Sequence, residues 1–153
     1  MIKVAGHWEL GWNTPIKEIE LWNLLLGEWG ITNMYIWPVS GVKQHEHNLN
    51  LHERDSFKDI INDDGVKGLT RVYFEPYNSF NQKERGIDLR EFEHPKNVLY
   101  IFGSNHFNPV IANKKEGDFV VQIPTIHNRA ILWPHQCLAI CCYDRLLKGW
   151  EGK

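Results

Sequence analysis

Residues 98–147 contain V-L-Y-I-F-G-S at 98–104, F-V-V-Q-I-P at 119–124 and I-L-W-P-H-Q-C-L-A-I-C-C-Y-D-R-L-L at 131–147. The first two stretches begin with short apolar runs that lack the polar alternation of a strand with one wet face. Such runs predict strands that are covered on both faces, as parallel strands between helices are. The third stretch predicts a closing helix from Pro134 to Leu147.

The rest of the chain repeats this alternation of short apolar runs and helix signals. Thr14-Pro15 starts a helix, because threonine can cap free N–H groups and proline suits the first helical position. Ser56 can cap a second, short helix through Ile61. The pattern predicts an α/β fold with a parallel-rich sheet of about five or six strands flanked by helices, in one domain over residues 1–153. Five of the strands are expected at Ile2–Ala5, Met34–Trp37, Leu69–Phe74, Val98–Phe102 and Phe119–Ile123.

Glycine and proline stand at the ends of the two C-terminal strands. Gly103 follows Phe102, and Pro124 follows Ile123. Glycine lets a ligand or another backbone approach closely, and proline fixes a turn. In open α/β sheets small molecules bind beyond the carboxyl ends of the strands, so these positions predict a ligand site.

The same residues carry a family resemblance. The order strand-F-G-S, strand-I-P, an apolar residue at fixed distance and a Tyr-acid pair in the last helix resembles the SPOUT superfamily of knotted RNA methyltransferases. The likeness is greatest to the small SpoU-like tRNA ribose 2′-O-methyltransferases. It is carried by Ile123-Pro124, Leu132 and Tyr143-Asp144, and by G-I-T-N-M-Y-I-W-P at 30–38, which looks like the family's segment after its first helix.

The resemblance implies a C-terminal trefoil knot, a cofactor and a substrate. S-adenosyl-L-methionine would lie among three loops that follow three strands, held by backbone groups and apolar walls. An RNA, tRNA or rRNA, would be the substrate. The corresponding cofactor residues in this chain are Glu75 and Pro76, then Phe102, Gly103 and Ser104, then Ile123 and Pro124 with Ile131 and Leu132.

The acceptor side departs from the family. An N-x-G-x-x-x-R pattern is expected on the first helix, and Glu18, Glu20 and Leu24 stand at those three positions. The Ser and Asn before the last helix are absent as well, since Ile131 and Trp133 stand there. These departures leave a second hypothesis open, in which the chain is a non-catalytic module that binds the cofactor or RNA.

Three residues could substitute on the acceptor side. Arg129 could bind a phosphate with its planar fork, or it is a surface charge. His135 could exchange a proton near neutral pH, or it is a capping or interface residue. Asn13 could position a hydroxyl. Trp8 and Trp12 could stack on a base, although such residues more often lie in a core or a dimer contact, and Trp22 is expected in the core.

Composition limits the partners and the setting. A net charge of −2 gives no general attraction to nucleic acid, although a dimer can collect basic residues in one groove. The first and last helices are apolar on more than one face, which predicts a homodimer. All three cysteines lie in the last helix and have no distant partner, which favours a reduced, cytoplasmic setting. The N-terminus does not resemble a signal peptide, and no apolar run reaches membrane-spanning length.

Two polar regions are expected to lack strands. Residues 40–54 read as a loop, and Asp88–Phe92 as a brief helix. The loop contains His45, His47 and His52, which could hold a metal but have no defined fourth ligand. A solvated loop is the other interpretation, and we expect no metal.

Overall fold

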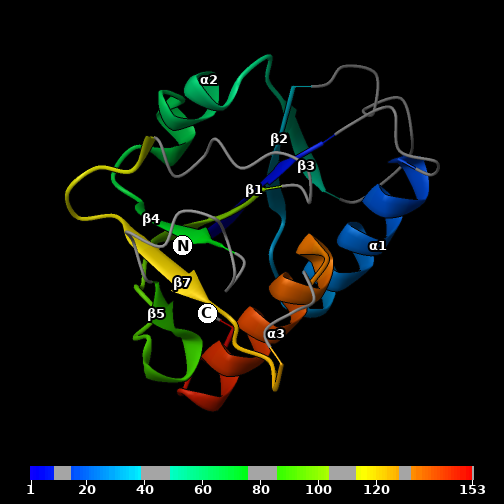
Figure 1. Ribbon diagram of the computed structural model, residues 1–153. Coiled ribbons are helices and arrows are strands. Elements are labelled where there is room, and N and C mark those ends of the chain that lie inside the picture. The colour runs from blue at the N-terminus through cyan, green and yellow to red at the C-terminus, as the bar shows by residue number, and fades with distance from the viewer. Residues whose placement is uncertain (9–14, 39–48, 76–85, 104–112, 128–131, 153) are drawn as a thin grey trace.

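The computed structural model describes residues 1–8, 15–38, 49–75, 86–103, 113–127 and 132–152 of the chain. Its centre is a seven-stranded sheet in the order β3-β2-β1-β6-β4-β7-β5, and every pair of neighbouring strands is parallel (Figure 1). The strands are β1 (Ile2–His7), β2 (Asn33–Trp37), β3 (Asn50–Glu53), β4 (Thr70–Phe74), β5 (Ile87–Asp88), β6 (Val98–Phe102) and β7 (Phe119–Gln122).

Helices cover both faces of this sheet. The long helices α1 (Pro15–Glu28) and α3 (Pro134–Leu147) lie on one face, and α2 (Phe57–Ile61) lies on the other (Figure 1). Short 3₁₀ turns, η2 (Asp64–Val66) and η3 (Leu89–Glu91), complete the described elements. The bounds expected for the closing helix, Pro134 to Leu147, are confirmed. None of the helices in the described residues is long and apolar enough to cross a membrane.

Strand β6 explains why its sequence lacks polar alternation. All five of its residues are buried, because the strand lies inside the sheet and both faces are covered. Val98, Tyr100 and Phe102 belong to the core under α1 and α3, whereas Leu99 and Ile101 belong to the core under α2. The prediction of central parallel strands covered on both faces is therefore confirmed.

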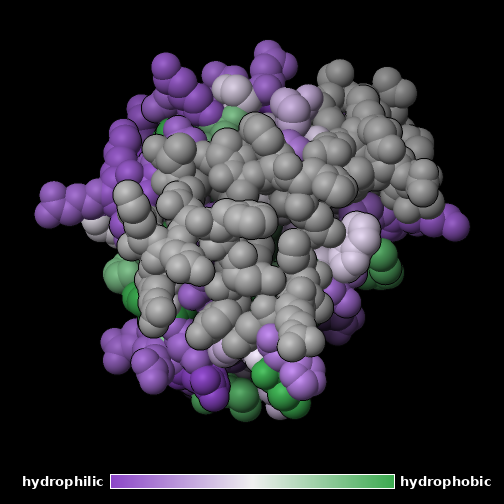
Figure 2. Space-filling view, in the orientation of Figure 1, coloured by the Kyte–Doolittle hydropathy of each residue, from purple (hydrophilic) through white to green (hydrophobic). Residues whose placement is uncertain are grey.

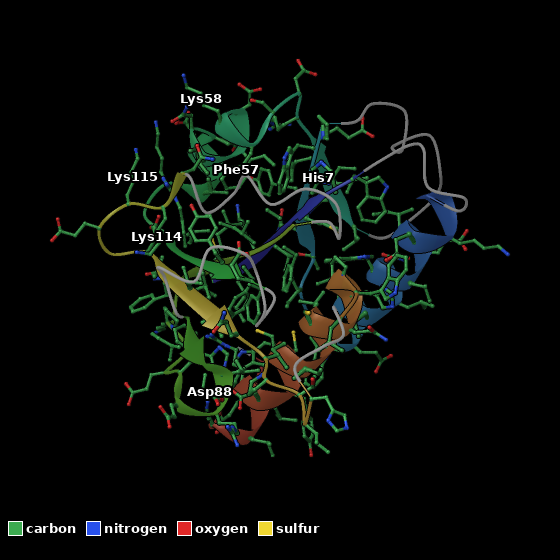
Figure 3. All side chains as sticks on the ribbon, in the orientation of Figure 1. His7, Phe57, Lys58, Asp88, Lys114 and Lys115 are labelled. Atoms are coloured by element: carbon green, nitrogen blue, oxygen red, sulfur yellow. The ribbon has the colours of Figure 1, made fainter. Side chains whose placement is uncertain are left out.

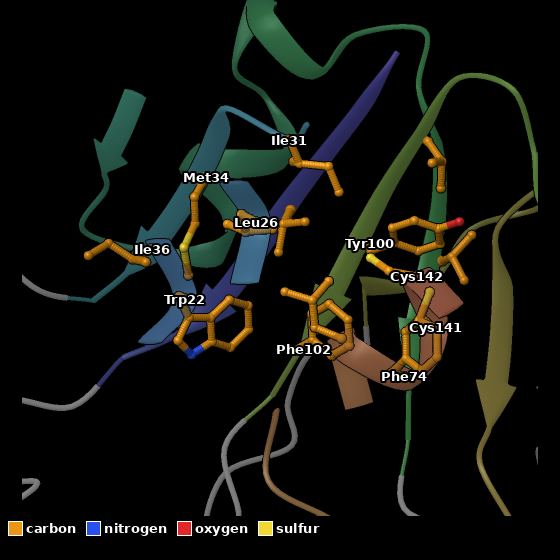
Figure 4. Packing of buried hydrophobic residues seen from close by; sticks show 14 of the residues in the cluster. Trp22, Leu26, Ile31, Met34, Ile36, Phe74, Tyr100, Phe102, Cys141 and Cys142 are labelled. Carbon is orange, nitrogen blue, oxygen red and sulfur yellow. The ribbon is translucent and has the colours of Figure 1, made fainter. Parts of the chain in front are cut away.

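Trp22 of α1 belongs to the larger core (Figure 4). Its ring makes edge contacts with Trp8, at 6.0 Å between centroids, and with Phe102, at 5.8 Å. Leu26, one turn later on the same helix, is fully buried beside it. The expectation that Trp22 is a core residue is confirmed. The interpretation of Trp8 as a base-stacking residue is wrong, because only 1% of Trp8 is exposed; Trp12 lies outside the described residues.

The opposite face is covered by α2, which begins as expected. The Ser56 hydroxyl accepts a hydrogen bond from the Asp59 backbone N–H at 3.2 Å and so caps the helix. Phe57 packs inward on Trp37 and Tyr73, whereas Lys58 points away from the sheet (Figure 3). A short helix of this kind gains its stability from the buried ring rather than from its own length.

The C-terminal ends of α1 and α3 lie against each other. Gly30 has φ of 66° and Gly149 has φ of 93°, a backbone conformation that ends helices and that glycine adopts without strain. Trp29 and Trp150, which flank these turns, stack with centroids 6.0 Å apart. The stacked pair fixes the two helix ends against each other.

Two expectations about the sheet need correction. The sheet has seven strands rather than five or six, because β3 and β5 fall in regions that were expected to be a loop and a brief helix. Both are edge strands with a single apolar residue, so their pairing rather than their own sequence defines them. The helical turn expected near 88–92 is the 3₁₀ turn η3. The trefoil knot stays a prediction, since residues 104–112 and 128–131 lie outside the described part.

Replacing Trp22 by alanine should lower the free energy of unfolding by about 3 to 5 kcal/mol, because a large buried ring leaves a cavity that the core cannot fill. Lys58 on α2, which is exposed on the opposite face of the sheet, provides the control. Lys58→Ala should change the unfolding free energy by no more than about 0.5 kcal/mol. Urea unfolding followed by circular dichroism measures both; equal losses in the two variants would contradict this packing.

Candidate functional site

Three of the strand ends singled out in the sequence meet at one edge of the sheet. Strand β4 lies between β6 and β7, and its last residue, Phe74, is in register with Phe102 of β6 and Val121 of β7. The Glu75 backbone N–H donates to the Val121 carbonyl at 3.1 Å and extends this pairing past the end of β4. The segments that begin at Glu75, Gly103 and Ile123 therefore leave the sheet side by side.

Two aromatic side chains, Phe74 and Phe102, are stacked at these strand ends. The rings of Phe74 and Phe102 stack with centroids 4.9 Å apart and an interplanar angle of 16°. Glu75 is only 5% exposed, whereas Gly103 and Ile123 are partly exposed. This arrangement offers apolar walls, backbone groups of strand ends and one buried carboxyl to a ligand. Such a set fits S-adenosylmethionine, which has an aromatic ring system, several polar edges and a positively charged sulfur.

The last helix contributes a second wall. A cavity of about 450 Å³ extends from Ile123 and Pro124 to Tyr143 of α3, with Leu89 and Leu147 also in its lining. The I-P step and the tyrosine of the Tyr-acid pair are thus brought together, although 19 positions separate Pro124 from Tyr143 in the numbering. Leu132 is partly buried just before this helix. The other cofactor candidates, Pro76, Ser104 and Ile131, lie outside the described residues.

His135 is the one catalytic candidate that the structure describes; Arg129 and Asn13 lie outside the described residues. The His135 Nδ1 atom lies 2.8 Å from Oε1 of Glu18 on α1. The same oxygen accepts a hydrogen bond from the Trp22 indole N–H at 3.2 Å. Sequence reasoning missed this pair, because it read Glu18 as a departure from the family pattern and because Glu18 stands 117 positions from His135.

Asp144, the acid of the Tyr-acid pair, belongs to a polar network rather than to the cavity wall alone. Its Oδ2 atom accepts from Lys148 Nζ at 2.7 Å and lies 2.8 Å from His94 Nε2. On the other side of the imidazole, Nδ1 lies 2.6 Å from the Tyr100 hydroxyl, which accepts from Arg145 Nη1 at 2.9 Å. Because Arg145 can only donate, the Tyr100 proton is directed to His94 Nδ1, and Nε2–H donates to Asp144.

This network holds His94 in its neutral form. Burial, which penalises the charged imidazolium, lowers the pKa of His94, although the hydrogen bond to Asp144 acts in the opposite direction. Burial also raises the pKa of the Tyr100 hydroxyl well above its usual range. The network therefore ties α3 to the segment before β6 without a net proton exchange near neutral pH.

The three cysteines of α3 are free thiols on the core side of the helix. Burial raises the pKa of Cys137 and of Cys142 to about 12, and it raises the pKa of Cys141 well above its ordinary value. They serve as small apolar residues in the core.

The histidine-rich loop is described only at its end. His52 lies in β3, where its ring stacks on Tyr35 at 4.5 Å, and its Nε2 lies 3.3 Å from Asn33 Oδ1. His45 and His47 lie outside the described residues. Within the described ranges, no group of three or more His, Cys, Asp or Glu side chains could hold a metal ion.

Comparison with known proteins gives a consistent answer at the level of the fold. No family model matches the sequence, and no curated protein matches it. Among solved structures, one that concerns the 2-OH methylation of C/U34 on tRNA is 14% identical, with a TM-score of 0.67; it covers 97% of this chain and 92% of that one. An AdoMet-bound rRNA methyltransferase from Sinorhizobium meliloti is 12% identical, with a TM-score of 0.67 and 98% of this chain covered. The SpoU methyltransferase AviRb from Streptomyces viridochromogenes is 12% identical, with a TM-score of 0.71 and 97% covered.

These matches show the fold of the chain. Over nearly its whole length the chain has the fold of the SpoU/TrmH RNA methyltransferases of the SPOUT superfamily, at low sequence identity. The resemblance expected from the strand ends and the last helix is thereby confirmed. The chain spans 57% of the Sinorhizobium protein and 59% of AviRb, so those proteins are considerably longer.

The His94 network should make stability depend on pH. Because the pKa of His94 is lower in the folded chain than in the unfolded chain, unfolding takes up a proton as pH falls through the ordinary histidine range, about 6.5. The free energy of unfolding should therefore be constant above this range and decrease below it. Urea titrations at several pH values measure this slope. His94→Gln should flatten it between about pH 7 and 5; an unchanged slope would remove His94 as its source.

Proposed function

We propose that this chain is an S-adenosylmethionine-dependent RNA methyltransferase that methylates a ribose 2′-hydroxyl of tRNA or rRNA. The observation that carries the proposal is the meeting of three strand ends, after β4, β6 and β7, at one edge of a sheet with the SpoU/TrmH fold. We further propose that residues 1–153 act as one SPOUT-like domain in the cytoplasm. The free, buried cysteines support a reducing setting.

The proposed cofactor residues have distinct tasks. Gly103 admits the ligand close to the backbone, and Phe102 supports it through the stacked pair with Phe74. Glu75 would offer a carboxyl to a positively charged ligand, and Pro124 and Leu132 would supply apolar contact. S-adenosylmethionine supplies an activated methyl group. We also assign Pro76, Ser104, Ile123 and Ile131 to this site, on the resemblance alone.

On the acceptor side we keep Arg129, Asn13 and His135 as the proposed catalytic candidates. A non-catalytic module that binds the cofactor or RNA is the second proposal, and one observation favours it. Leu24, at the position where the family has arginine, is 68% exposed and presents an apolar side chain to solvent. It has no group that could bind a phosphate or polarise a hydroxyl.

The apolar surface of the long helices supports a homodimer. Leu21 and Leu24 on α1 are 49% and 68% exposed. On α3, Tyr143, Leu146 and Leu147 are exposed as well. Hydrophobic surface over the outer side of α1 and below the C-terminal end of α3 is visible in the space-filling view (Figure 2). Exposed apolar side chains on two adjacent helices are typical of a protein contact, and a second copy would bury them.

The function is tested by transfer of a tritiated methyl group from S-adenosylmethionine to total cellular RNA, followed by nucleoside analysis. The proposal requires labelled RNA whose product is a 2′-O-methylated nucleoside. A methylated base would overturn the ribose assignment. A protein that binds the cofactor but transfers no methyl group to any RNA would support the non-catalytic module.

Gly103→Val should abolish or strongly weaken S-adenosylmethionine binding, by at least about tenfold, because a branched side chain would occupy the closest ligand approach. Isothermal titration calorimetry measures the affinity. Gly27→Val is the matched control, since a Cβ at Gly27 meets no atom within 4 Å and this position lies in the last turns of α1. Unchanged affinity in a folded Gly103→Val protein would remove the site.

Leu24→Glu should dissociate the proposed dimer without unfolding the chain, because Leu24 is exposed in the single chain and a buried, unpaired carboxylate would oppose association. Sedimentation equilibrium at micromolar concentration measures the mass, and thermal unfolding monitors the fold. Lys58→Glu on α2, on the opposite face of the sheet, is the control and should leave the mass unchanged. A monomeric wild-type protein would contradict the dimer.

A further inference from the structure

Glu18 and His135 form a carboxylate–imidazole pair between two helices. Glu18 lies in the first turn of α1, and His135 lies in the first turn of α3. Their side chains are 13% and 28% exposed, so the pair is mostly buried but open to a ligand. A carboxylate only accepts hydrogen bonds, so the 2.8 Å contact requires a proton on Nδ1 of His135.

This geometry leaves the other ring nitrogen with a lone pair. In the neutral imidazole one nitrogen donates and the other accepts, so Nε2 of His135 is an acceptor. Among the described residues Nε2 has no hydrogen-bond partner. Among the described residues, Glu18 supplies the charged side chain that contacts the His135 ring. An imidazole held by a carboxylate on one side and open on the other is the arrangement of a general base.

The carboxylate is itself fixed in place. Oε1 of Glu18 accepts from the Trp22 indole N–H as well as from His135. Trp22 is 1% exposed and is packed between Trp8 and Phe102, so it cannot move without disturbing the core. The imidazole orientation is therefore set by a rigid part of the molecule, as a catalytic base requires.

Two short connections link this pair to the proposed cofactor site. Trp22, which holds Glu18, makes an edge contact with Phe102, the residue before Gly103, at 5.8 Å between centroids. Leu132, which we assign to the cofactor, stands three positions before His135, and its carbonyl lies 3.9 Å from Cys137 Sγ in the first turns of α3. The pair is thus attached to both the β6 end and the segment that leads into α3.

We propose that Glu18 and His135 are the acceptor-side pair of the methyl transfer, with His135 as general base and Glu18 as its positioning residue. This inference rests on the proposed function. It gives Glu18, at the position where the family has asparagine, a role in place of the missing arginine at the position of Leu24. Among the described histidines near the proposed cofactor site, His135 is the one whose ring is held by a carboxylate and whose second nitrogen is unpaired.

The step balances without another reactant. Nε2 of His135 takes the proton of the ribose 2′-hydroxyl while the oxygen forms a bond to the methyl carbon. The bond between that carbon and the sulfonium sulfur breaks, and its electron pair stays on sulfur. The products are the methylated ribose, neutral S-adenosylhomocysteine and a protonated His135, whose charge Glu18 stabilises. The partly exposed imidazolium then releases its proton to water.

A purely structural pair that clamps α1 to α3 is the competing explanation, and conservative variants separate the two. His135→Gln and Glu18→Gln both retain hydrogen-bonding side chains between the helices. For a catalytic pair, His135→Gln should lower kcat by at least about 100-fold and Glu18→Gln by about tenfold, with S-adenosylmethionine affinity unchanged by calorimetry. For a clamp, melting temperature and cofactor affinity should fall instead, with kcat retained in the protein that remains folded.

The pH dependence and a chemical probe give readouts that a clamp would not change. The wild-type rate should rise with pH as a histidine base loses its proton, and His135→Gln should lose this acid limb. His94→Gln, which removes the histidine of the His94–Asp144 pair, is the matched control and should keep this acid limb.

The chemical probe is diethyl pyrocarbonate, which ethoxycarbonylates histidine. Mass spectrometry should locate the modification on His135 in the free protein, and the modification should be absent when RNA and S-adenosylhomocysteine are bound.

The outcomes distinguish this inference from the function on which it rests. A wild-type protein that transfers no methyl group overturns both. An active wild type whose His135→Gln variant keeps its rate and its acid limb overturns the catalytic pair alone. Modification of His135 that RNA does not prevent also overturns it, because Nε2 would then lie away from the acceptor.

Discussion

The parallel pairing of β6 with β1 on one side and β4 on the other is the constraint on which the rest of the structure depends. In this register Tyr100 lies opposite Val4 and Val72, and Phe102 lies opposite Gly6 and Phe74. A slip of one residue would turn Tyr100 and Phe102 toward α2 and exchange both cores. Because parallel strands return through crossovers, the same pairing also brings every carboxyl end to one edge. The ligand site and the packing of the long helices follow from it.

Helix α3 is placed on this sheet by two kinds of contact. Its middle is apolar and buried through Leu138, Cys141 and Cys142, which supply burial but no directional preference. Its ends are polar and directional. His135 meets Glu18 at the first turn, and Lys148, which directly follows the last turn, donates to the carbonyls of Leu89 at 2.6 Å and Phe92 at 2.9 Å. The apolar middle binds the helix to the face of the sheet, and the polar ends determine its rotation and its position along its axis.

The parts of the fold that the sequence predicts are those defined by burial. Central strands such as β6 and β4 are apolar because both of their faces are covered, so their runs can be read directly. The edge strands β3 and β5 carry one apolar residue each, and a neighbouring strand supplies what makes them strands. No local pattern in 50–53 or 87–88 distinguishes them from polar loops.

The candidate site divides in the same way. Gly103 and Pro124 mark strand ends, and a strand end can be recognised from one residue and its neighbours. The contacts of Glu18 with His135, and of His94 with Asp144, depend on how helices and segments far apart in the chain are packed. Spacing along the sequence does not indicate such pairs. The family pattern also drew attention away from the Glu18–His135 pair, because it marked Glu18 only as the absence of the expected asparagine.

The buried thiols of α3 have a practical consequence. A cysteine reacts through its thiolate, and pKa values of about 12 at Cys137 and Cys142 leave almost none of it at neutral pH. The native cysteines should therefore not react with maleimide or methanethiosulfonate reagents while the chain is folded. A single cysteine introduced at exposed Lys58 would carry a fluorophore or spin label alone. The motion of α2 could then be followed in an otherwise native protein, with its own three thiols left in place.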